Sequence, residues 1–500
     1  MAQASLTVDP DFSIGRIDPR LFGSFVEHLG RCVYEGIYEP GHPAADEHGL
    51  RRDVLDLARE LGITVVRYPG GNFVSGYRWE DGVGPDRPTR LDLAWRSVET
   101  NAFGLHEFMG WIEQVGAQPM LAVNLGTRGV QEAADLIEYC NFPGGTELSD
   151  TRIKNGAADP FGVRLWCLGN EVDGPWQVGQ KSASEYGRLA AETAKAMRLV
   201  DPSIELVACG SSSRKSNTFA SWDAAVLEET YDVVDYLSLH CYFEERSDLA
   251  SFLASAVDMD AFIGEVIATC DFVKGRRRSA KTMKLSLDEW NVWYEERYRA
   301  ERREAWQRAP HLIEDEYSLV DAVAVGSYLI TLLHHADRIS VACHAQLVNV
   351  IAPIRTEAGG PAWRQPIFYP FADVARFAKG QSLQVSVRSP LMDTVAYGPV
   401  PAVNAAASHD HETGQVAVFL VNRDLQATIP VELTLAQARN LRVSHHTVLH
   451  DDDIRAQNSA RDPQRVTPGP GRGAVLEDGR LRLELPPVSW TTVVLTENRR

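Results

Sequence analysis

The sequence predicts an α/β protein in which a (β/α)8 TIM barrel is followed by a smaller antiparallel, jelly-roll-like β-sandwich. Between about residues 20 and 380, eight short β-rich runs alternate with longer segments of helical periodicity. Beyond residue 381 the pattern becomes an alternation of short β-like runs and turns, with no comparable helix. Eight strand-then-helix units in order are typical of a closed barrel, because open doubly wound sheets usually have fewer.

The predicted barrel strands are apolar runs that end in polar or aromatic residues. They are Phe22–Glu27, Ile63–Gly71, Ala117–Asn124, Val163–Glu171, Glu205–Ser211, Val233–Tyr242, Met283–Asn291 and Ser340–Asn349. The predicted helices are Leu50–Leu61, Ala102–Gly116, Val130–Cys140, Ala183–Val200, Trp222–Thr230, Leu249–Val273, Ser318–Ala336 and Ile367–Ala378. Within Ala183–Val200 the apolar residues recur at helical spacing, which indicates one buried stripe.

The sandwich strands are predicted from alternating or apolar runs separated by Asp, Asn, Gly and Pro. These runs are Gln415–Asn422, Thr428–Leu435, Leu441–Leu449 and Gly479–Leu495, and Gln457–Gly473 is expected to be a long loop. Ser5–Val8 is also β-like and is expected to join this sandwich from the other end of the chain. The predicted division is therefore 1–18 for the N-terminal strand of the sandwich, 19–380 for the barrel and 381–500 for the C-terminal sandwich.

Charge and composition exclude several classes of function. The 500 residues carry a formal net charge of −18. No basic excess is available for phosphate backbones or anionic lipid, so neither nucleic acid nor a membrane is an expected partner. The N-terminus lacks the features of a secretory signal, and no apolar run is long enough to span a bilayer. Seven scattered cysteines, mostly within apolar runs, favour a reduced cytoplasmic protein.

Motifs for cofactor and metal chemistry are missing from the sequence. There is no G-x-S-x-G elbow, no Walker A sequence and no strand-linked G-x-G-x-x-G. Zinc-binding motifs such as H-E-x-x-H and paired C-x-x-C are also missing. His334-His335 fits the end of a helix better than a ligand pair. We therefore expect neither a cofactor nor a metal.

Two glutamates at predicted strand ends are the strongest candidates for catalysis. Glu171 follows the fourth strand and Glu289 lies at the end of the seventh, so both are expected at the C-terminal mouth of the barrel. A single strand-end glutamate is more often a solvated acid. A pair facing each other at about 5–5.5 Å, however, is what a retaining glycosidase requires, with one acid/base and one nucleophile.

Other strand-end side chains have a functional and a structural interpretation. Asn170 is either a hydrogen-bond donor to the sugar 2-OH or a turn residue. Arg67 either holds Glu289 ionised or forms a salt bridge at the barrel rim. His240 and Tyr242 share one face of the sixth strand, so both either point into the site or pack in the core. Trp95, Trp293 and Trp176 are either walls for a sugar or ordinary packed residues.

Five motifs together resemble the α-L-arabinofuranosidases of glycoside hydrolase family 51. They are Phe22-Gly-Ser-Phe-Val-Glu-His28, Arg67-Tyr-Pro-Gly-Gly-Asn-Phe73, Trp166-Cys-Leu-Gly-Asn-Glu171, Leu287-Asp-Glu-Trp-Asn-Val-Trp-Tyr294 and Ala345-Gln-Leu-Val-Asn-Val-Ile-Ala-Pro-Ile354. The resemblance implies a retaining mechanism with Glu171 as acid/base and Glu289 as nucleophile. It also implies that the furanose is surrounded by Glu27, Arg67, Asn72, Asn170, His240, Tyr242 and Gln346, with Trp95 and Trp293 as walls. It further implies an intracellular homohexamer.

One residue departs from the family pattern, since His344 stands where a bulky apolar residue is expected. The favoured function is an exo-acting α-L-arabinofuranosidase that acts on arabino- and arabinoxylo-oligosaccharides. The alternatives are the same chemistry on another glycone (a galactofuranosidase, xylosidase or endo-glucanase) and a non-catalytic sugar-binding barrel. The presence of both glutamates argues against the non-catalytic alternative. The preferred linkage and the aglycone are left open by the sequence.

Overall fold

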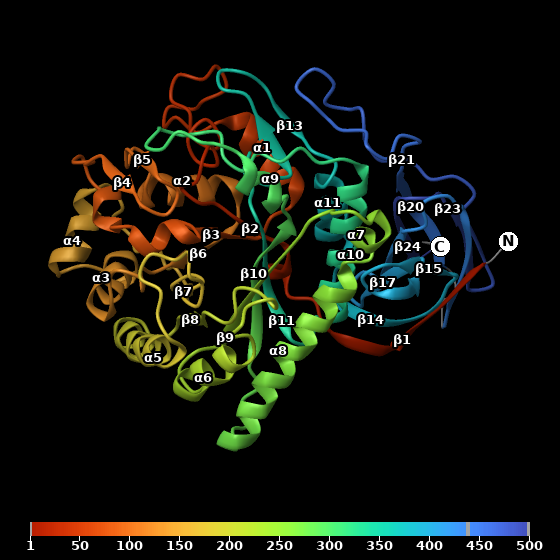
Figure 1. Ribbon diagram of the computed structural model, residues 1–500, viewed down its shortest axis with the longest axis horizontal. Coiled ribbons are helices and arrows are strands. Elements are labelled where there is room, and N and C mark those ends of the chain that lie inside the picture. The colour runs from red at the N-terminus through yellow and green to blue at the C-terminus, as the bar shows by residue number, and fades with distance from the viewer. Residues whose placement is uncertain (1–2, 437–440, 498–500) are drawn as a thin grey trace.

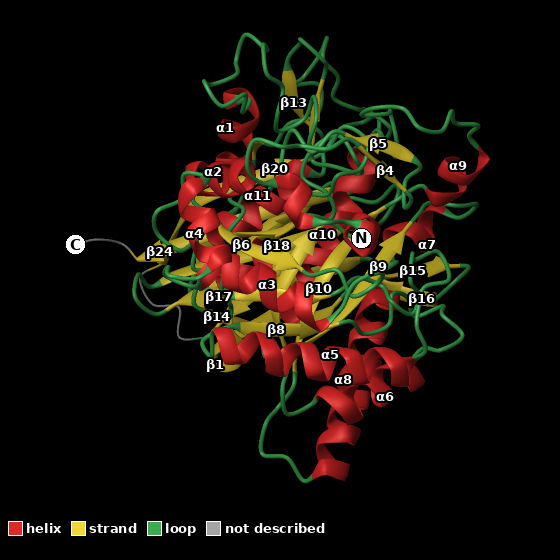
Figure 2. Cartoon of the chain, turned by 90° about the vertical axis from the view of Figure 1, so that its left-hand side faces the viewer, coloured by secondary structure: helices red, strands yellow, loops and turns green. Residues whose placement is uncertain are grey.

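The computed structural model describes residues 3–436 and 441–497. A closed barrel surrounded by helices lies beside a large β-sheet that contains most of the C-terminal strands (Figure 1). Helices enclose the barrel strands when the molecule is viewed from the barrel side (Figure 2). The predicted combination of a (β/α)8 barrel and a β-sandwich is confirmed.

The barrel closes in the strand order β10-β11-β2-β3-β6-β7-β8-β9, and neighbouring strands are parallel throughout. Its strands are β2 (Gly23–Phe25), β3 (Val65–Tyr68), β6 (Gln118–Ala122), β7 (Leu165–Leu168), β8 (Glu205–Ala208), β9 (Tyr236–Phe243), β10 (Lys284–Val292) and β11 (Ile339–His344). Each predicted run overlaps one of these strands. The eighth strand is shorter than predicted, since it ends at His344.

The helices lie close to their predicted positions, with two exceptions. The helices are α1 (Arg52–Leu61), α2 (Leu105–Val115), α3 (Val130–Asn141), α4 (Glu147–Lys154), α5 (Ala183–Val200), α6 (Ser221–Thr230), α7 (Leu249–Leu253), α8 (Ala256–Arg277), α9 (Glu295–Ala300), α10 (Leu319–His334) and α11 (Phe368–Phe377). The exceptions are α4 and α9, which lie where no helix was predicted. The prediction of one helix over Leu249–Val273 was wrong, because the chain breaks between α7 and α8. At this break the Ser255 hydroxyl bonds to the Phe252 carbonyl and to the Tyr328 hydroxyl.

Short hairpins interrupt the alternation and were not predicted. They are β4 (Arg90–Asp92) with β5 (Ser97–Glu99), β12 (Ile354–Thr356) with β13 (Ala362–Arg364), and β15 (Leu391–Thr394) with β16 (Gly398–Pro401). The β4–β5 hairpin follows the second barrel strand and carries Trp95 in its turn. It therefore brings an aromatic side chain to the barrel mouth from outside the strand ends.

The C-terminal sheet has ten strands and includes the N-terminal strand of the chain. Its order is β21 (Gly469–Pro470), β20 (Leu441–Leu449), β24 (Ser489–Glu497), β18 (Gln415–Asn422), β17 (Val403–Asp410), β14 (Gln381–Arg388), β1 (Ala4–Arg16), β19 (Ile429–Leu435), β23 (Arg480–Leu485) and β22 (Val475–Glu477). Strand β1 pairs antiparallel with β14 but parallel with β19, so the sheet is not antiparallel throughout. We keep 1–18, 19–380 and 381–500 as the proposed division.

Gly479–Leu495 forms two strands and not the single strand that was predicted. Pro486 and Pro487 lie between β23 and β24, and neither can donate a backbone hydrogen bond to a ladder. Strands β14 and β17 were not predicted. Strand β14 alternates buried and exposed residues weakly, whereas a run of small residues makes up the centre of β17.

Helix α10 joins the barrel to the sheet. Its residues from Leu319 to Leu333 are all buried, which is the pattern of a helix covered by protein on every side. A β-carbon on Gly326 would lie 2.5 Å from the ring of Trp490 on β24, so the small residue allows close packing.

Among the described residues, none of the helices has the length and apolarity that crossing a membrane requires.

Candidate active site

Glu171 follows strand β7 in a strained backbone conformation. Its φ is 42°, in the left-handed region that non-glycine residues seldom adopt, and Gly169 two residues earlier has φ 94°. The side chain is directed to the barrel mouth, where Glu171 Oε1 lies 2.8 Å from Nδ1 of His240. Strain of this kind persists where the surrounding structure enforces it, and it is concentrated at functional sites.

Glu289 and its neighbour Asp288 both face the barrel interior, although successive residues of a regular strand point to opposite faces. The cause is an extra residue in β10. Ser286 pairs with Ser238 of β9, whereas Glu289 pairs with His240, so β10 uses three residues where β9 uses two. Such a bulge redirects side chains locally, which accounts for two inward carboxylates in sequence.

The two glutamates lie at the distance expected of a retaining pair. One oxygen of Glu171, one ring nitrogen of His240 and one oxygen of Glu289 all lie within 4.8 Å of one another. An inverting enzyme needs about 6.5–9.5 Å between its carboxyl groups to admit a water molecule. The spacing therefore fits direct attack by one carboxylate and proton transfer by the other.

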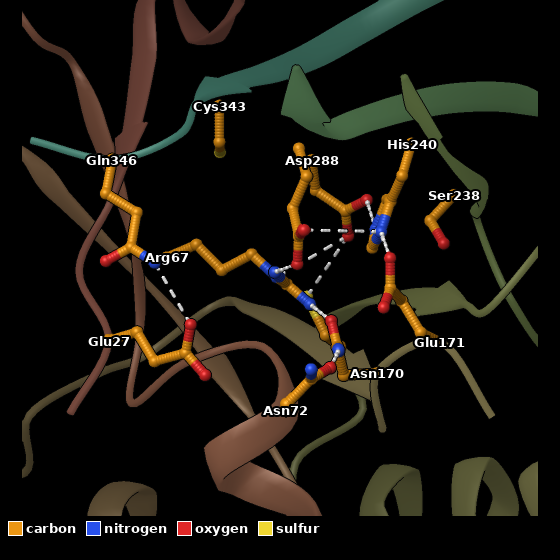
Figure 3. A network of polar contacts seen from close by, with 12 residues as sticks. Glu27, Arg67, Asn72, Asn170, Glu171, Ser238, His240, Asp288, Cys343 and Gln346 are labelled. Atoms are coloured by element: carbon orange, nitrogen blue, oxygen red, sulfur yellow. Dashed lines mark hydrogen bonds and ion pairs between the residues drawn. The ribbon is translucent and has the colours of Figure 1, made fainter. Parts of the chain in front are cut away.

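Arg67 on β3 holds Glu289 in place. It also holds Asn170, as Figure 3 shows. The guanidinium donates to Glu289 Oε1 at 2.8 Å and to Asn170 Oδ1 at 2.5 Å, and its side chain is 1% exposed. A buried charge without a partner is strongly destabilising, so the arginine and the carboxylate stabilise one another here. The bond also fixes Asn170, directly before Glu171.

His240 and Tyr242 on β9 both reach the carboxylates. The Tyr242 hydroxyl donates to Glu289 Oε2 at 2.8 Å, so each oxygen of Glu289 has a donor. His240 lies between Glu171 and Asp288, with Nε2 3.0 Å from Asp288 Oδ1 (Figure 3). Because a strand repeats every two residues, the pair shares the face that points to the site.

Glu27 after β2 occupies a second, more enclosed part of the site. Its Oε1 accepts bonds from the Phe73 backbone N–H and from Trp95 Nε1, both at 2.9 Å. Its Oε2 accepts from Gln346 Nε2 at 3.0 Å. Burial raises the pKa of Glu27 to about 8, although the Phe73 and Trp95 donors oppose the shift.

Asn72 adds another polar group to the site. Its Oδ1 accepts hydrogen bonds from Gln177 Nε2 at 2.5 Å and from Asn170 Nδ2 at 3.4 Å. Gln177 was not predicted, because it lies in the middle of the loop between β7 and α5 and not at the strand end itself. The eleven residues predicted for the site thus meet around one mouth: Glu27, Arg67, Asn72, Trp95, Asn170, Glu171, His240, Tyr242, Glu289, Trp293 and Gln346.

Aromatic rings form the rim of the site. The Trp293 ring lies edge-on to Tyr242, with centroids 5.3 Å apart, and Tyr298 on α9 lies 6.0 Å from Trp293 and 6.5 Å from Trp95. Tyr298 therefore brings the charged segment from Tyr294 to Arg303 to the rim of the barrel mouth. Trp176 is 53% exposed, and its Nε1 donates to Glu171 Oε2 at 2.7 Å.

The environment of Glu171 favours its protonated form. Burial raises the pKa of Glu171, the negative charge of Glu289 raises it further, and the bonds from His240 and Trp176 oppose the shift. For His240, burial by itself lowers the pKa, but the charge of Glu289 and the contacts with Asp288 and Glu171 outweigh it and raise the pKa well above its usual value. A carboxyl group whose pKa is raised by its surroundings suits a general acid.

Within the described part of the chain, one set of three metal-type ligand groups converges: Glu171, His240 and Glu289. Their arrangement does not fit a resident divalent ion. Both nitrogens of His240 and both oxygens of Glu289 already have protein partners, and the fixed charge of Arg67 adjoins Glu289. The expectation of a metal-free enzyme stays a prediction.

His344 lies outside the site, although it belongs to the last barrel strand. It is 1% exposed and packs edge-on against Trp290 at 4.8 Å and beside Phe371 at 5.7 Å. It fills the apolar space where the family pattern suggested a bulky apolar residue. Burial lowers the pKa of His344 to about 3, so its ring is neutral at ordinary pH.

A carboxyl pair at this spacing, across the C-terminal mouth of a barrel, defines a glycoside hydrolase site. Comparison with known proteins agrees. Residues 57–280 match the sequence model described as "Alpha-L-arabinofuranosidase 1 domain", and residues 288–489 match "Alpha-L-arabinofuranosidase C-terminal domain".

Individual relatives are similar over nearly the whole chain. An "Intracellular exo-alpha-(1->5)-L-arabinofuranosidase" from Streptomyces lividans is 58% identical, over 99% of this chain and 75% of the relative. An "Exo-alpha-(1->6)-L-arabinofuranosidase" from Bifidobacterium longum is 52% identical, over 99% and 97%. The solved structure of a family 51 α-L-arabinofuranosidase from Bifidobacterium longum has a TM-score of 0.95 at 46% identity, covering 99% of both chains. The chain belongs to the α-L-arabinofuranosidases of glycoside hydrolase family 51.

Proposed function

We propose that the protein is a retaining, exo-acting α-L-arabinofuranosidase that removes terminal, non-reducing arabinofuranosyl residues from arabino- and arabinoxylo-oligosaccharides. Glu171 is the acid/base and Glu289 is the nucleophile. The observation that carries the proposal is the approach of the two carboxyl groups, whose oxygens lie within 4.8 Å of one another. Family membership supports the arabinofuranose as the glycone.

In the first step, Glu289 attacks the anomeric carbon while Glu171 gives its proton to the departing oxygen. Arg67 and Tyr242 hold the two oxygens of Glu289, so its orientation is fixed before the substrate arrives. In the second step, Glu171 takes a proton from water, and that water releases the sugar from Glu289. Asn170, positioned by Arg67, is suited to bond the sugar 2-OH, and such bonds strengthen in the transition state.

The proposed binding site for the glycone is centred on Glu27, whose carboxylate accepts hydrogen bonds from Trp95, Gln346 and the Phe73 backbone. A buried carboxyl and an amide are hydrogen-bonding partners for the hydroxyl groups of one terminal sugar, which suits an exo mode of attack. The linkage is a finer question. The Streptomyces lividans relative is named for (1→5) linkages and one from Bifidobacterium longum for (1→6), so both deserve to be assayed.

Two variants test the assignment of roles. Glu171→Ala removes the proton donor, which matters greatly for a poor leaving group and little for dinitrophenolate. Glu289→Ala removes the attacking atom, so every substrate should fail at the first step. The measurement is kcat/KM for aryl α-L-arabinofuranosides as a function of leaving-group pKa. If Glu289→Ala keeps near-normal rates on the activated substrate, the roles are reversed.

A panel of aryl glycosides tests the substrate class. Release of arabinose from an aryl arabinofuranoside, with far slower turnover of the galactofuranoside, the xyloside and glucan chains, is expected. Equal or faster turnover of another glycone would favour the alternative enzymes. No turnover of any glycoside would favour a non-catalytic barrel.

The location and assembly are proposed from the family alone. Several relatives are named intracellular, which supports a cytoplasmic enzyme acting on short imported oligosaccharides. A homohexamer is the assembly that the family resemblance implies. Sedimentation velocity of the purified protein tests it, and a monomer at micromolar concentration would contradict it.

A further inference from the structure

Asp288 is a buried carboxylate that touches the catalytic network but reaches neither the mouth nor the sugar pocket. It is 1% exposed. Its Oδ1 lies 3.0 Å from His240 Nε2, and its Oδ2 lies 3.6 Å from Arg67 Nε. The bulge in β10 is what turns this side chain inward beside Glu289. No step of the proposed reaction uses it.

Both nitrogens of His240 face a carboxylate oxygen in each half of the proposed reaction, because Glu289 is ionised in the free enzyme and Glu171 in the glycosyl-enzyme. Nδ1 faces Glu171 Oε1 at 2.8 Å and Glu289 Oε2 at 3.5 Å, and Nε2 faces Asp288. A ring that lies between carboxylate oxygens on both sides is held as an imidazolium. The cluster therefore contains two buried cations, Arg67 and His240.

We propose that Asp288 is a positioning residue that acts through His240, supplying the fixed negative charge that keeps the buried cluster neutral in both halves of the reaction. This inference rests on the proposed roles of Glu171 and Glu289. In the free enzyme Glu171 holds a proton and Glu289 is an anion. In the glycosyl-enzyme Glu171 is an anion and Glu289 is a neutral ester. The catalytic pair thus carries one negative charge in each state.

Two cations and one negative charge leave an excess of positive charge, which a third carboxylate must balance. Asp288 is in contact with both cations. The proton balance is simple. Glu171 gives a proton to the leaving oxygen in the first step and regains one from water in the second, while Asp288 stays ionised and His240 keeps both of its ring protons. With neutrality preserved, neither step has to create an uncompensated buried charge.

The remaining groups that face this cluster do not supply the charge. Cys167 Sγ on β7 donates to Asp288 Oδ2 at 3.7 Å, and burial raises the pKa values of Cys167, Cys209 and Cys343, which keeps these thiols neutral. Tyr242 is also kept neutral, because burial raises its pKa. Asp173 Oδ2 accepts hydrogen bonds from the backbone N–H and the hydroxyl of Ser212, and burial raises the pKa of Asp173, which disfavours its ionised form.

The test is Asp288→Asn, which keeps an oxygen for His240 Nε2–H but removes the charge. The excess positive charge should move the alkaline limb of the kcat/KM profile to lower pH by about 1–2 units, because Glu171 and His240 titrate as a pair. In the glycosyl-enzyme Glu171 becomes a weaker base, so kcat on a dinitrophenyl substrate should fall by roughly 3–10-fold. Cys167→Ala is the control, since it alters packing beside Asp288 and leaves the charge. The limbs of the kcat/KM profile of Cys167→Ala should stay at their wild-type pH.

His240→Gln provides a test with the opposite sign. Removal of the cation should move the alkaline limb to higher pH, and the double variant Asp288→Asn/His240→Gln should return it towards the wild-type position. Thermal unfolding of each variant shows whether it is folded. If Asp288→Asn does not fold, the shift of the alkaline limb in His240→Gln still tests the proposal. Unchanged limbs in folded Asp288→Asn, or a uniform loss of rate at every pH, would overturn the proposal. A wrong assignment of Glu171 as the acid/base would be recognised separately, because the alkaline limb of the wild-type kcat/KM profile would then still be present in Glu171→Ala.

Discussion

The backbone of Gly70 lies directly against the side chain of Glu27. A β-carbon on Gly70 would be 2.4 Å from Glu27 Cγ, and the φ of Gly70 is +152°. No other residue fits here without moving the carboxyl that lines the proposed sugar pocket. The glycine after β3 thus sets the position of a side chain that follows β2.

Gly70→Ala should therefore lower kcat/KM by at least about 10-fold, since even a displacement of about 1 Å in a binding group is costly. Steady-state kinetics on an aryl arabinofuranoside measures the effect. The matched control is Gly76→Ala in the same loop region, where a β-carbon meets nothing within 4 Å. Equal rates for the two variants would mean that Glu27 does not need its present position.

Glu27→Gln should make the protein more stable and less active. The pKa of Glu27 is raised to about 8 in the folded protein, so the folded state holds a proton that the unfolded chain releases above about 4.5. The wild type therefore loses stability as pH rises from about 4.5 to 8, and the amide variant escapes this loss. The difference in Tm between variant and wild type should grow across that window.

A Tm difference that stays constant from pH 5 to 8 would show that Glu27 is ionised in the folded protein. Glu80→Gln, on the surface, controls for the removal of a carboxylate. The loss of activity in Glu27→Gln should be large at every pH, because the substituted group lines the proposed sugar pocket. A stabilised but inactive variant is the usual sign of a residue kept for function.

His344→Leu should stabilise the protein against acid. The folded pKa of His344 is lowered to about 3, against about 6.5 in an unfolded chain, so the unfolded state takes up a proton first. The contribution of the neutral His344 ring to the free energy of unfolding is intact above pH 6.5 and is lost as pH falls, at roughly 1.4 kcal/mol per pH unit. Leucine cannot be protonated and suits the contacts with Trp290 and Phe371.

Thermal unfolding from pH 7 to 5 measures this effect, and His48→Leu on the surface is the matched control. The Tm advantage of His344→Leu should widen towards pH 5. A variant that is less stable than wild type at all pH values would show that the imidazole makes a needed polar contact. Within the described residues, neither of its nitrogens has a hydrogen-bond partner.

Prolonged dialysis against EDTA should leave kcat and Tm unchanged. The three groups that converge as possible ligands are already bonded within the protein, and Arg67 adds a positive charge beside them. Activity is measured before and after dialysis, and again after addition of Mg²⁺, Mn²⁺ or Zn²⁺. A loss that a divalent ion reverses would contradict the prediction.

Features that depend on local periodicity were predictable from the sequence. The barrel follows from strand-then-helix alternation, and His240 and Tyr242 share a face because a strand repeats every two residues. The inward direction of Asp288 was not predictable, since it depends on a bulge that is defined by pairing with β9. The break between α7 and α8 lies in a segment without glycine or proline, where Tyr328 from α10 contacts Ser255. The contact that accompanies this break is tertiary.

The place of β1 in the C-terminal sheet has a consequence for synthesis on the ribosome. Strand β1 is synthesised before the barrel, yet its partners β14 and β19 emerge only after the entire barrel has been made. At ~5–20 residues per second, the strand waits roughly 20–80 s with both hydrogen-bonding edges unpaired. During that interval its apolar residues Leu6 and Val8, buried in the finished sheet, are open to chaperones and to other nascent chains. The sheet therefore cannot be completed until the barrel has been synthesised, and removal of β1 or of the C-terminal strands takes away a part of the same structure.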